Sequence, residues 1–228
     1  MATAQELATL QSAIMTLLNL PAAGRLLQLN SNTCERAYEA YVFSLYCEAV
    51  RRAGGTVQLM GIQSGASPEP VVFRGSPGSM ASQDQDFAYA SCSLRQKRFE
   101  LHVDVEYQGS SGALHEIDVS VCDETHAVAV RGTRGTPKAT GNKLLMVFEC
   151  KFYESTPGVS LGRTFVGLIS DCGNLRLKGF VANVPSDKLK QYFSKSSRPQ
   201  PFLGLNPSDP ESEERFVRSV EQELRRWA

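Results

Sequence analysis

The chain has 228 residues, of which 24 are basic, 24 are acidic and 42% are hydrophobic. This length suits one well-packed domain with a full core and is short for two independent domains. Because the formal net charge is zero, no overall field attracts polyanions, so any nucleic-acid site must be a local cluster of cations.

The cysteines and the N-terminal segment predict a soluble, cytoplasmic protein with no membrane association. None of the six cysteines belongs to a CxxC pair, and most lie among apolar residues, where a reduced thiol packs as a small hydrophobic group. Residues 1–18 carry an acidic residue and no basic residue, which argues against a signal peptide. No apolar run is long enough to span a bilayer.

The first predicted elements are two helices. Residues 3–28 place apolar side chains at helical spacing, and Pro21 is the expected stop. We treat residues 1–30 as a helical preface to a single domain over residues 31–228. That domain begins with the helix "NSNTCERAYEAYVFSLYCEAVRRAGG", which Asn32 or Thr33 can cap and which two glycines end.

A loop and a meander of strands are expected next. Residues 63–85 are rich in Ser, Gly, Pro and Gln, which predicts a long mobile loop. The segment "FAYASCSLRQKRFELHVDVEYQ" has the alternation of a half-buried strand, and the turn "GSSGA" leads into the strand "LHEIDVSV". A second loop, "VRGTRGTPKATGNK", follows; it is rich in Gly and Thr.

The remaining segments predict a central strand, a crossover and a terminal helix. The run "LLMVF", residues 144–148, is apolar throughout, as expected of a strand covered on both faces. The segment "SLGRTFVGLISDCG" predicts a helix capped by Ser160, "LKGFVANV" predicts a strand, and "SEERFVRSVEQELRRWA" predicts an amphipathic helix. Together these elements predict an α/β domain with a central mixed sheet flanked by helices.

Charged residues interrupt the apolar strand in a specific pattern. In "LLMVFECKFYES", side chains alternate faces, so Glu149 and Lys151 project from one face and Cys150 packs on the other. The alternative to a functional site is that Glu149 and Lys151 form a solvent-exposed ion pair on an edge strand. The apolar run before Glu149 favours an interior strand, where charges are tolerated when they are paired or bind a metal.

The strand "HEIDVSV" carries a matching pattern. Glu116, Asp118 and Ser120 share one of its faces. If the two strands are neighbours in the sheet, Asp118 and Glu149 approach one hard cation, with Lys151 beside them. Carboxylate oxygens suit Mg²⁺ or Mn²⁺, whereas zinc requires Cys or His at spacings that this sequence lacks.

These residues resemble a known family. The pattern "EID", then a loop, then "ECK" is similar to the PD-(D/E)xK nuclease superfamily, also called the restriction-endonuclease-like fold. The resemblance covers roughly residues 33–185 and implies a restriction-endonuclease-like core. It implies that Asp118 and Glu149 hold the metal, that the Cys150 backbone carbonyl adds an oxygen ligand, and that Lys151 positions the attacking water.

The resemblance extends to the helix before the strands. The segment "AYEAYVFSLYCEAVRRAG" is similar to the first helix of many members, which supplies a carboxylate, so Glu39 is the candidate ahead of Glu35. A solvated helix face is the alternative for both residues. Glu116 is either a further metal ligand or an exposed charge beside the site.

A basic loop lies between the two acidic strands. Candidate nucleic-acid contacts are Arg131, Arg134, Lys138, Lys143 and, near the start of the next helix, Arg163. A solvated loop and a surface salt bridge are the alternatives for these residues.

The resemblance implies a Mg²⁺-dependent endonuclease that hydrolyses DNA, in the setting of a bacterial restriction or anti-phage defence system. No module that reads bases is recognisable, so specificity is expected from loops, a homo-oligomer or a partner protein. The alternatives are an RNA nuclease with the same chemistry and a non-catalytic interaction subunit with the same fold.

Overall fold

A computed structural model of the protein describes residues 4–21, 26–28, 33–82, 84–132, 138–195 and 198–228. The helices are α1 (Ala4–Leu17), α2 (Cys34–Arg52), α3 (Glu124–Gly132), η1 (Gly141–Lys143, a 3₁₀ turn), α4 (Val159–Ser170), α5 (Asp187–Tyr192) and α6 (Pro210–Trp227). The strands are β1 (Leu26–Gln28), β2 (Thr56–Gly61), β3 (Val71–Phe73), β4 (Ala88–Leu94), β5 (Lys97–Gln108), β6 (Leu114–Asp123), β7 (Ala139–Thr140), β8 (Leu144–Lys151), β9 (Leu177–Ala182) and β10 (Gln200–Leu203).

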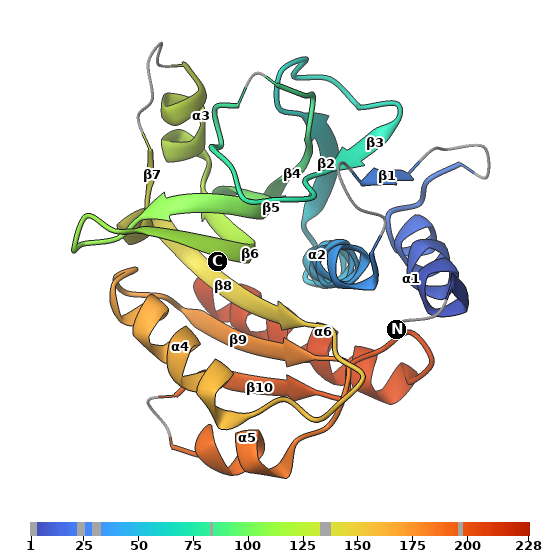
Figure 1. The fold of residues 1–228 in the computed structure, drawn as a ribbon. Helices are drawn as coiled ribbons and strands as arrows, with labels where there is room; N and C mark the ends of the chain where they lie inside the picture. Colours follow the sequence, from blue (N-terminus) through green and yellow to red (C-terminus); the bar gives the residue numbers. More distant parts are fainter. Residues whose placement is uncertain (1–3, 22–25, 29–32, 83, 133–137, 196–197) are drawn as a thin grey trace.

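The main sheet is mixed and has eight strands (Figure 1). Its order is β10-β9-β8-β6-β5-β4-β2, with β7 added beside β5, while β1 and β3 form a separate pair. Every pair of neighbours from β8 through β6, β5 and β4 to β2 is antiparallel, whereas β9 and β10 run parallel to β8. The predicted α/β arrangement with a central mixed sheet flanked by helices is therefore confirmed.

Two apolar clusters lie on opposite faces of the sheet. Residues of α1, α2 and α6 fill one cluster, and residues of α3, α4 and α5 fill the other. Figure 1 shows α4 on the near side of β9 and α6 on the far side. Since Leu10 and Ile14 of α1 belong to the same cluster as α2, the N-terminal helix packs on the domain. The proposed boundary at residue 30 stays a prediction.

Helix α2 runs through the middle of the structure, where it appears end-on in Figure 1. The Thr33 side chain caps its first turn by accepting from the N–H of Arg36, as one of the two predicted caps. At the other end Gly54 takes a left-handed conformation (φ 93°), which glycine adopts without a steric penalty. Because α2 is buried between the sheet, α1 and α6, its first turns can carry side chains directly to the strands.

The β5–β6 hairpin changes face at its middle. Leu101 and Val103 of β5 pack in the cluster of α2, whereas Val105 and Tyr107 pack in the opposite cluster. The residue at the change, Asp104, has a positive φ of 52°. The predicted half-buried strand is therefore wrong in detail, because β5 is buried on both faces from residue 99 to residue 105.

The first helix and the first loop also differ from expectation. Helix α1 ends at Leu17, before the expected stop at Pro21, and Asn19 follows with φ 53°, while residues 26–28 form β1 instead of continuing the helical pattern. The segment 63–85, expected to be a long mobile loop, contains β3 and buries Met80 and Arg74. The Arg74 guanidinium stacks on the ring of Phe87, so this polar segment is anchored by packing that its composition does not show.

Three further boundaries are corrected. Residues 88–108 form the hairpin β4–β5, with Arg95 in the turn at φ 51°, rather than one strand. The second predicted loop begins inside α3 and ends in η1. Ser160 is the second residue of α4, whose cap position is Gly158. In the parts of the chain that are described, no helix combines the length and apolarity needed to cross a bilayer.

Candidate active site

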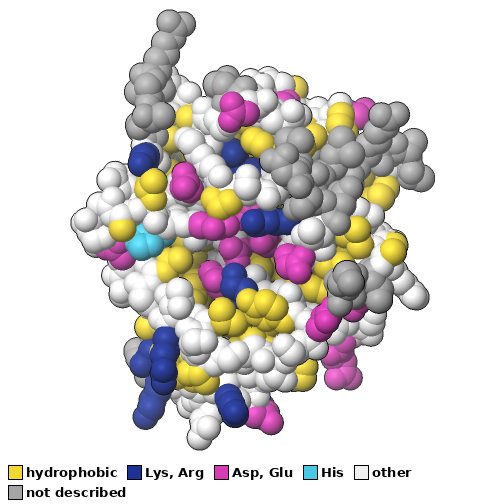
Figure 2. Space-filling model, viewed as in Figure 1, with side chains coloured by type: hydrophobic (Ala, Val, Ile, Leu, Met, Phe, Trp, Pro, Cys, Tyr) yellow, Lys and Arg dark blue, Asp and Glu magenta, His cyan; other side chains and the backbone are white. Residues whose placement is uncertain are grey.

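A cavity of about 430 Å³ opens where the first turns of α2 meet β6 and the end of β8. Its charged lining includes Arg36, Glu39, Asp118, Glu149 and Lys151. Figure 2 shows acidic side chains gathered around basic ones at the centre of this face, with apolar side chains directly below them. A larger cavity, about 750 Å³, lies between β10, α5 and α6. We place the chemistry in the smaller one because carboxylates and cations from three elements, α2, β6 and β8, converge there.

Strands β6 and β8 bring the predicted residues together. The register pairs Val119 with Phe148, which puts Asp118 and Glu149 at adjacent positions of neighbouring strands. Oδ2 of Asp118 accepts a hydrogen bond from the N–H of Cys150 at 2.7 Å and a second from Nζ of Lys151 at 3.2 Å. Asp118 is therefore fixed by the backbone of the strand that carries Glu149 and Lys151.

Lys151 links two carboxylates. Its Nζ lies 2.7 Å from Oε1 of Glu149 and 3.2 Å from Oδ2 of Asp118. Burial, with the neighbouring charge of Asp118, raises the pKa of Glu149 to about 7. Burial alone would lower the pKa of Lys151, but the charges of Asp118 and Glu149 raise it above its ordinary value. The ammonium therefore stays protonated at neutral pH.

A second group of carboxylates adjoins Asp118. Ligand oxygens of Glu39, Asp104 and Asp118 all lie within 4.8 Å of one another, and the three side chains are buried. Burial and the charges of Asp104 and Asp118 raise the pKa of Glu39 well above its ordinary value. The structure thus brings Glu39 to Asp118, as the resemblance implies, and adds Asp104, which the sequence reading did not include.

Asp104 sits at the point where β5 changes face. Its side chain is fully buried, and burial raises its pKa to about 7. Gly78 holds its backbone in place, because the Gly78 N–H donates to the Asp104 carbonyl oxygen at 3.1 Å and the Glu106 N–H donates to the Gly78 carbonyl oxygen at 3.0 Å. An aspartate in the left-handed region is uncommon within a strand, and here the conformation aims the carboxylate at the cavity's acidic group.

Arg36 is the cation of this group. Its Nη1 lies 2.9 Å from both oxygens of Asp104 and 3.1 and 3.2 Å from the two oxygens of Glu39. The Glu116 carboxylate, 3.8 Å from the same nitrogen, is 41% exposed. Burial, followed by the charge of Asp118, raises the pKa of Glu116. Glu116 therefore stands at the mouth of the cavity, Glu39 lines it at a buried position, and Asp104 is fully buried next to Glu39. Glu35, the alternative to Glu39, is exposed.

The donor set fits a hard divalent cation. All the buried ligand atoms of the triad are carboxylate oxygens, which Mg²⁺ and Mn²⁺ prefer, and a positively charged guanidinium already stands among them. Histidines are engaged elsewhere: His102 with Glu100, His115 with Asp171, and His126 with the N–H of Thr140. The Cys150 side chain packs in the core, as predicted.

Two parts of the predicted ligand set have a different environment. Glu149 is not part of the triad; it reaches Asp118 through Lys151. Cys150 offers its N–H to Asp118, while coordination by its backbone carbonyl stays a prediction. The three carboxylates close enough to one another to share a cation are therefore those of Asp118, Asp104 and Glu39.

The residues predicted to contact nucleic acid lie in different environments. Arg131 lies in α3 rather than in a loop, and both of its Nη atoms donate to the buried Glu100 carboxylate at 2.5 Å. This ion pair holds α3 on β5, so the predicted loop position of Arg131 is corrected, while its contact with nucleic acid stays a prediction. Lys138, Lys143 and Arg163 are exposed and form no ion pair with the residues that the structure describes, so their contact with phosphate stays a prediction. Arg134 lies outside the described residues.

Sequence patterns contained a weak signal for the two residues missed. On the β5–β6 hairpin Glu106 pairs with Glu116, and the flanking pairs put Asp104 opposite Asp118. Acidic residues therefore alternate on both arms of the hairpin. Arg36 precedes Glu39 by three residues, a spacing at which helical side chains meet. Neither pattern reveals the left-handed turn that carries Asp104 inward.

No protein-family model, characterised protein sequence or solved structure matches this chain.

Proposed function

We propose that the protein is a metal-dependent phosphodiesterase that cleaves DNA, with Mg²⁺ or Mn²⁺ as its cofactor. One observation carries the proposal: Lys151 bridges Asp118 and Glu149 on adjacent strands of one cavity. This arrangement agrees with the resemblance of "EID" and "ECK" to the PD-(D/E)xK nucleases, and a restriction-endonuclease-like core is part of the proposal. The neighbouring carboxylates of Glu39 and Asp104 add ligands for the cation.

The protein's own residues divide the work. Asp118, Asp104 and Glu39 would hold the cation, whose chemistry is to neutralise the scissile phosphate and to acidify a water molecule. Lys151, with Glu149 beside it, orients this water in line with the leaving oxygen and stabilises charge on the phosphate. A bond forms between the water oxygen and phosphorus as the water gives up a proton to solvent, the bond from phosphorus to the leaving oxygen breaks, and the leaving oxygen takes a proton from solvent.

A cleavage assay tests the proposal. Purified protein is incubated with linear, nicked and single-stranded DNA in Mg²⁺, Mn²⁺ or EDTA. We expect divalent-dependent cleavage by the wild type and a loss of about 100-fold or more in Asp118→Asn and Lys151→Gln. Glu211→Gln, on the exposed first turn of α6, is the matched control and should cleave normally. Cleavage that survives both site substitutions would reject this site as the source of activity.

One observation favours a non-catalytic alternative. The guanidinium of Arg36 already neutralises Asp104 and Glu39, so the acidic group is balanced without a metal, as a structural interaction module would require. Thermal unfolding with and without Mg²⁺ separates the two readings, because only a formed carboxylate site is stabilised by the cation. RNA in the same assay decides between DNA and RNA as substrate. A homo-oligomer or a partner protein that supplies sequence specificity belongs to the same proposal.

A further inference from the structure

Arg36 binds the acidic group in an unusual way. One nitrogen, Nη1, lies 2.9 to 3.2 Å from four oxygens of Asp104 and Glu39, and 3.8 Å from Glu116. Arg131 provides the contrast within the same chain, since its Nη1 and Nη2 each meet a different oxygen of Glu100. That fork is the usual arginine–carboxylate geometry. The Arg36 nitrogen instead stands among the carboxylates as a single positive centre.

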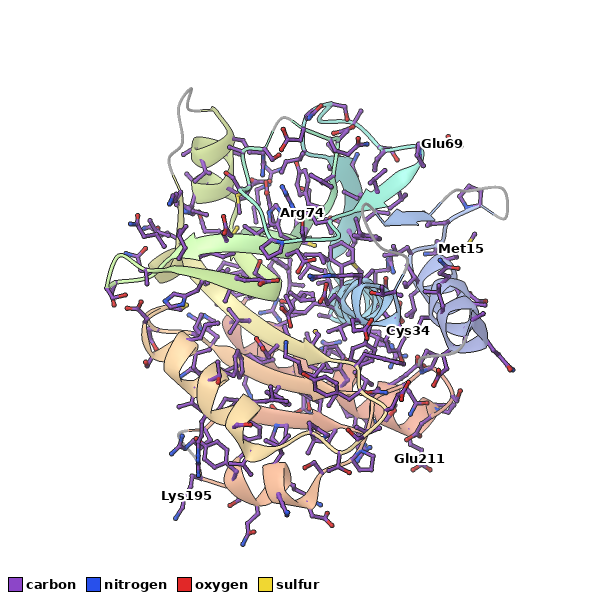
Figure 3. All side chains as sticks on the ribbon, in the orientation of Figure 1. Met15, Cys34, Glu69, Arg74, Lys195 and Glu211 are labelled. Carbon is purple, nitrogen blue, oxygen red and sulfur yellow. The ribbon has the colours of Figure 1, made fainter. Side chains whose placement is uncertain are left out.

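The carboxylates are fixed and the arginine can move. Asp104 is fully buried, and its backbone is held by Gly78 and the β5 ladder. Glu39 is 7% exposed and lies one turn inside α2. Arg36 stands in the first turn of α2, two residues after Cys34, whose label in Figure 3 marks the start of this helix, and its side chain is 23% exposed. Its long side chain can therefore leave the acidic group without any change in the backbone of α2 or β5.

A divalent cation and the guanidinium cannot share these oxygens. Mg²⁺ binds oxygen at about 2.1 Å, closer than the N–H contacts of Arg36, so it would need the same space between Asp104 and Glu39. Two positive charges so close together repel strongly in a buried site. We propose that Arg36 occupies the cation position of the metal-free protein and withdraws when the divalent cation binds. This inference rests on the proposed function and concerns the regulation of that same site.

The exchange has two consequences. In the metal-free protein Arg36 keeps the buried carboxylates from repelling one another, because an unpaired buried charge is strongly destabilising. Metal must displace Arg36, so the resident arginine weakens metal binding in the wild type. Removing it should destabilise the metal-free protein and tighten metal binding, a combination that loss of an ordinary structural ion pair would not produce.

Two binding measurements test the exchange. Mn²⁺ is titrated by electron paramagnetic resonance into the wild type, Arg36→Gln and the control Arg215→Gln, which removes an exposed arginine on α6. We expect Mn²⁺ to bind Arg36→Gln roughly tenfold or more tightly than the wild type, and to bind Arg215→Gln with the affinity of the wild type. In the wild type, the Arg36 Nη resonances are followed by nitrogen NMR during a Mg²⁺ titration. They should shift to the position of a solvent-exposed arginine, and the midpoint of this shift should coincide with the midpoint of metal binding. Arg36→Lys assigns the signals and serves as the second variant if Arg36→Gln does not fold.

The outcomes separate the two proposals. If Mn²⁺ binds the wild type but the Arg36 resonances do not change, or if Arg36→Gln binds with unchanged affinity, the exchange is rejected and the metal site stands. If neither protein binds Mn²⁺, the metal chemistry of the proposed function fails, and the exchange fails with it. A Mg²⁺-dependent shift of the Arg36 resonances, together with tighter Mn²⁺ binding by Arg36→Gln, supports both the metal site and the exchange.

Discussion

Asp104 and Asp118 face each other across the β5–β6 hairpin. The pairs Val103–Val119 and Val105–Ile117 bracket them, and at this point both strands pass from one core cluster to the other. The two carboxylates are therefore held together by the same distortion of the hairpin. This distortion, rather than the motif alone, brings the buried Asp104 carboxylate next to Asp118, which lines the cavity.

Asp104→Asn tests the role of this position. Asparagine tolerates the left-handed backbone and removes a carboxylate whose pKa burial raises to about 7. We expect a Tm at pH 8 no lower than that of the wild type, a loss of Mn²⁺ affinity of roughly tenfold or more, and a matching loss of cleavage. Thermal unfolding and Mn²⁺ titration measure these effects. Full metal affinity in Asp104→Asn would remove Asp104 from the ligand set.

Glu39 and Glu35 form a matched pair on α2. Glu39 is buried beside Asp104 and Asp118, whereas Glu35, one turn earlier, is exposed. We expect Glu39→Gln to weaken Mn²⁺ binding and cleavage by about tenfold or more, and Glu35→Gln to leave both within about twofold. Equal effects of the two substitutions would show that general charge near the cavity, and not ligation by Glu39, controls binding.

The free energy of unfolding of the metal-free protein should decrease as the pH rises. Burial raises the pKa of Asp104 from 3.8 and the pKa of Glu149 from 4.5, each to about 7. The folded state then binds more protons than the unfolded state between about pH 4 and pH 7, so the free energy of unfolding decreases across this window and levels off above it.

Urea denaturation at pH 5 and pH 8 measures this effect. The double variant Asp104→Asn/Glu149→Gln should lose most of the difference, because neither amide titrates. Saturating Mg²⁺ should also reduce it, since the cation stabilises the ionised carboxylates. Greater stability of the wild type at pH 8 than at pH 5, with the double variant unchanged, would refute the inferred burial of these groups.

Gly179 tests the packing that positions β8. A Cβ on this residue would collide with the ring of Phe148, which is fully buried against Tyr46 and Phe216 and cannot easily move. We expect Gly179→Ala to lower the free energy of unfolding by roughly 1–3 kcal/mol. Gly167→Ala, in open space on α4, is the control and should raise it by about 0.5–1 kcal/mol. Both values come from urea denaturation, and a neutral Gly179→Ala would contradict the close contact of β8 and β9.

Periodicity identified most of the elements around the site. The apolar run before Glu149 correctly predicted the interior strand β8, and alternation correctly predicted β6. Strand parity also predicted that Asp118 and Glu149 would come from adjacent strands. These features depend on local side-chain patterns, which a sequence displays directly.

Other features depend on contacts that local patterns do not encode. The burial of Arg74 and Met80 within a polar segment comes from packing on Phe87 and the second core cluster. The inward turn of Asp104 depends on Gly78, 26 residues earlier, whose N–H holds the Asp104 carbonyl. Arg131 was predicted to be a loop cation because its partner Glu100 lies on β5, far from it in the sequence. Tertiary contacts of this kind override local propensity.

The most direct test of the account is calorimetric titration of Mn²⁺ into the wild type and Asp118→Asn at neutral pH. Asp118 belongs to the triad with Glu39 and Asp104 and is also bound by Lys151. Both the proposed metal binding and the proposed positioning of Lys151 therefore depend on it. We predict saturable binding to the wild type and a loss of affinity of about tenfold or more in the variant. Equal binding by the two proteins, or no binding to the folded wild type, would contradict the claim that this cavity is a divalent metal centre.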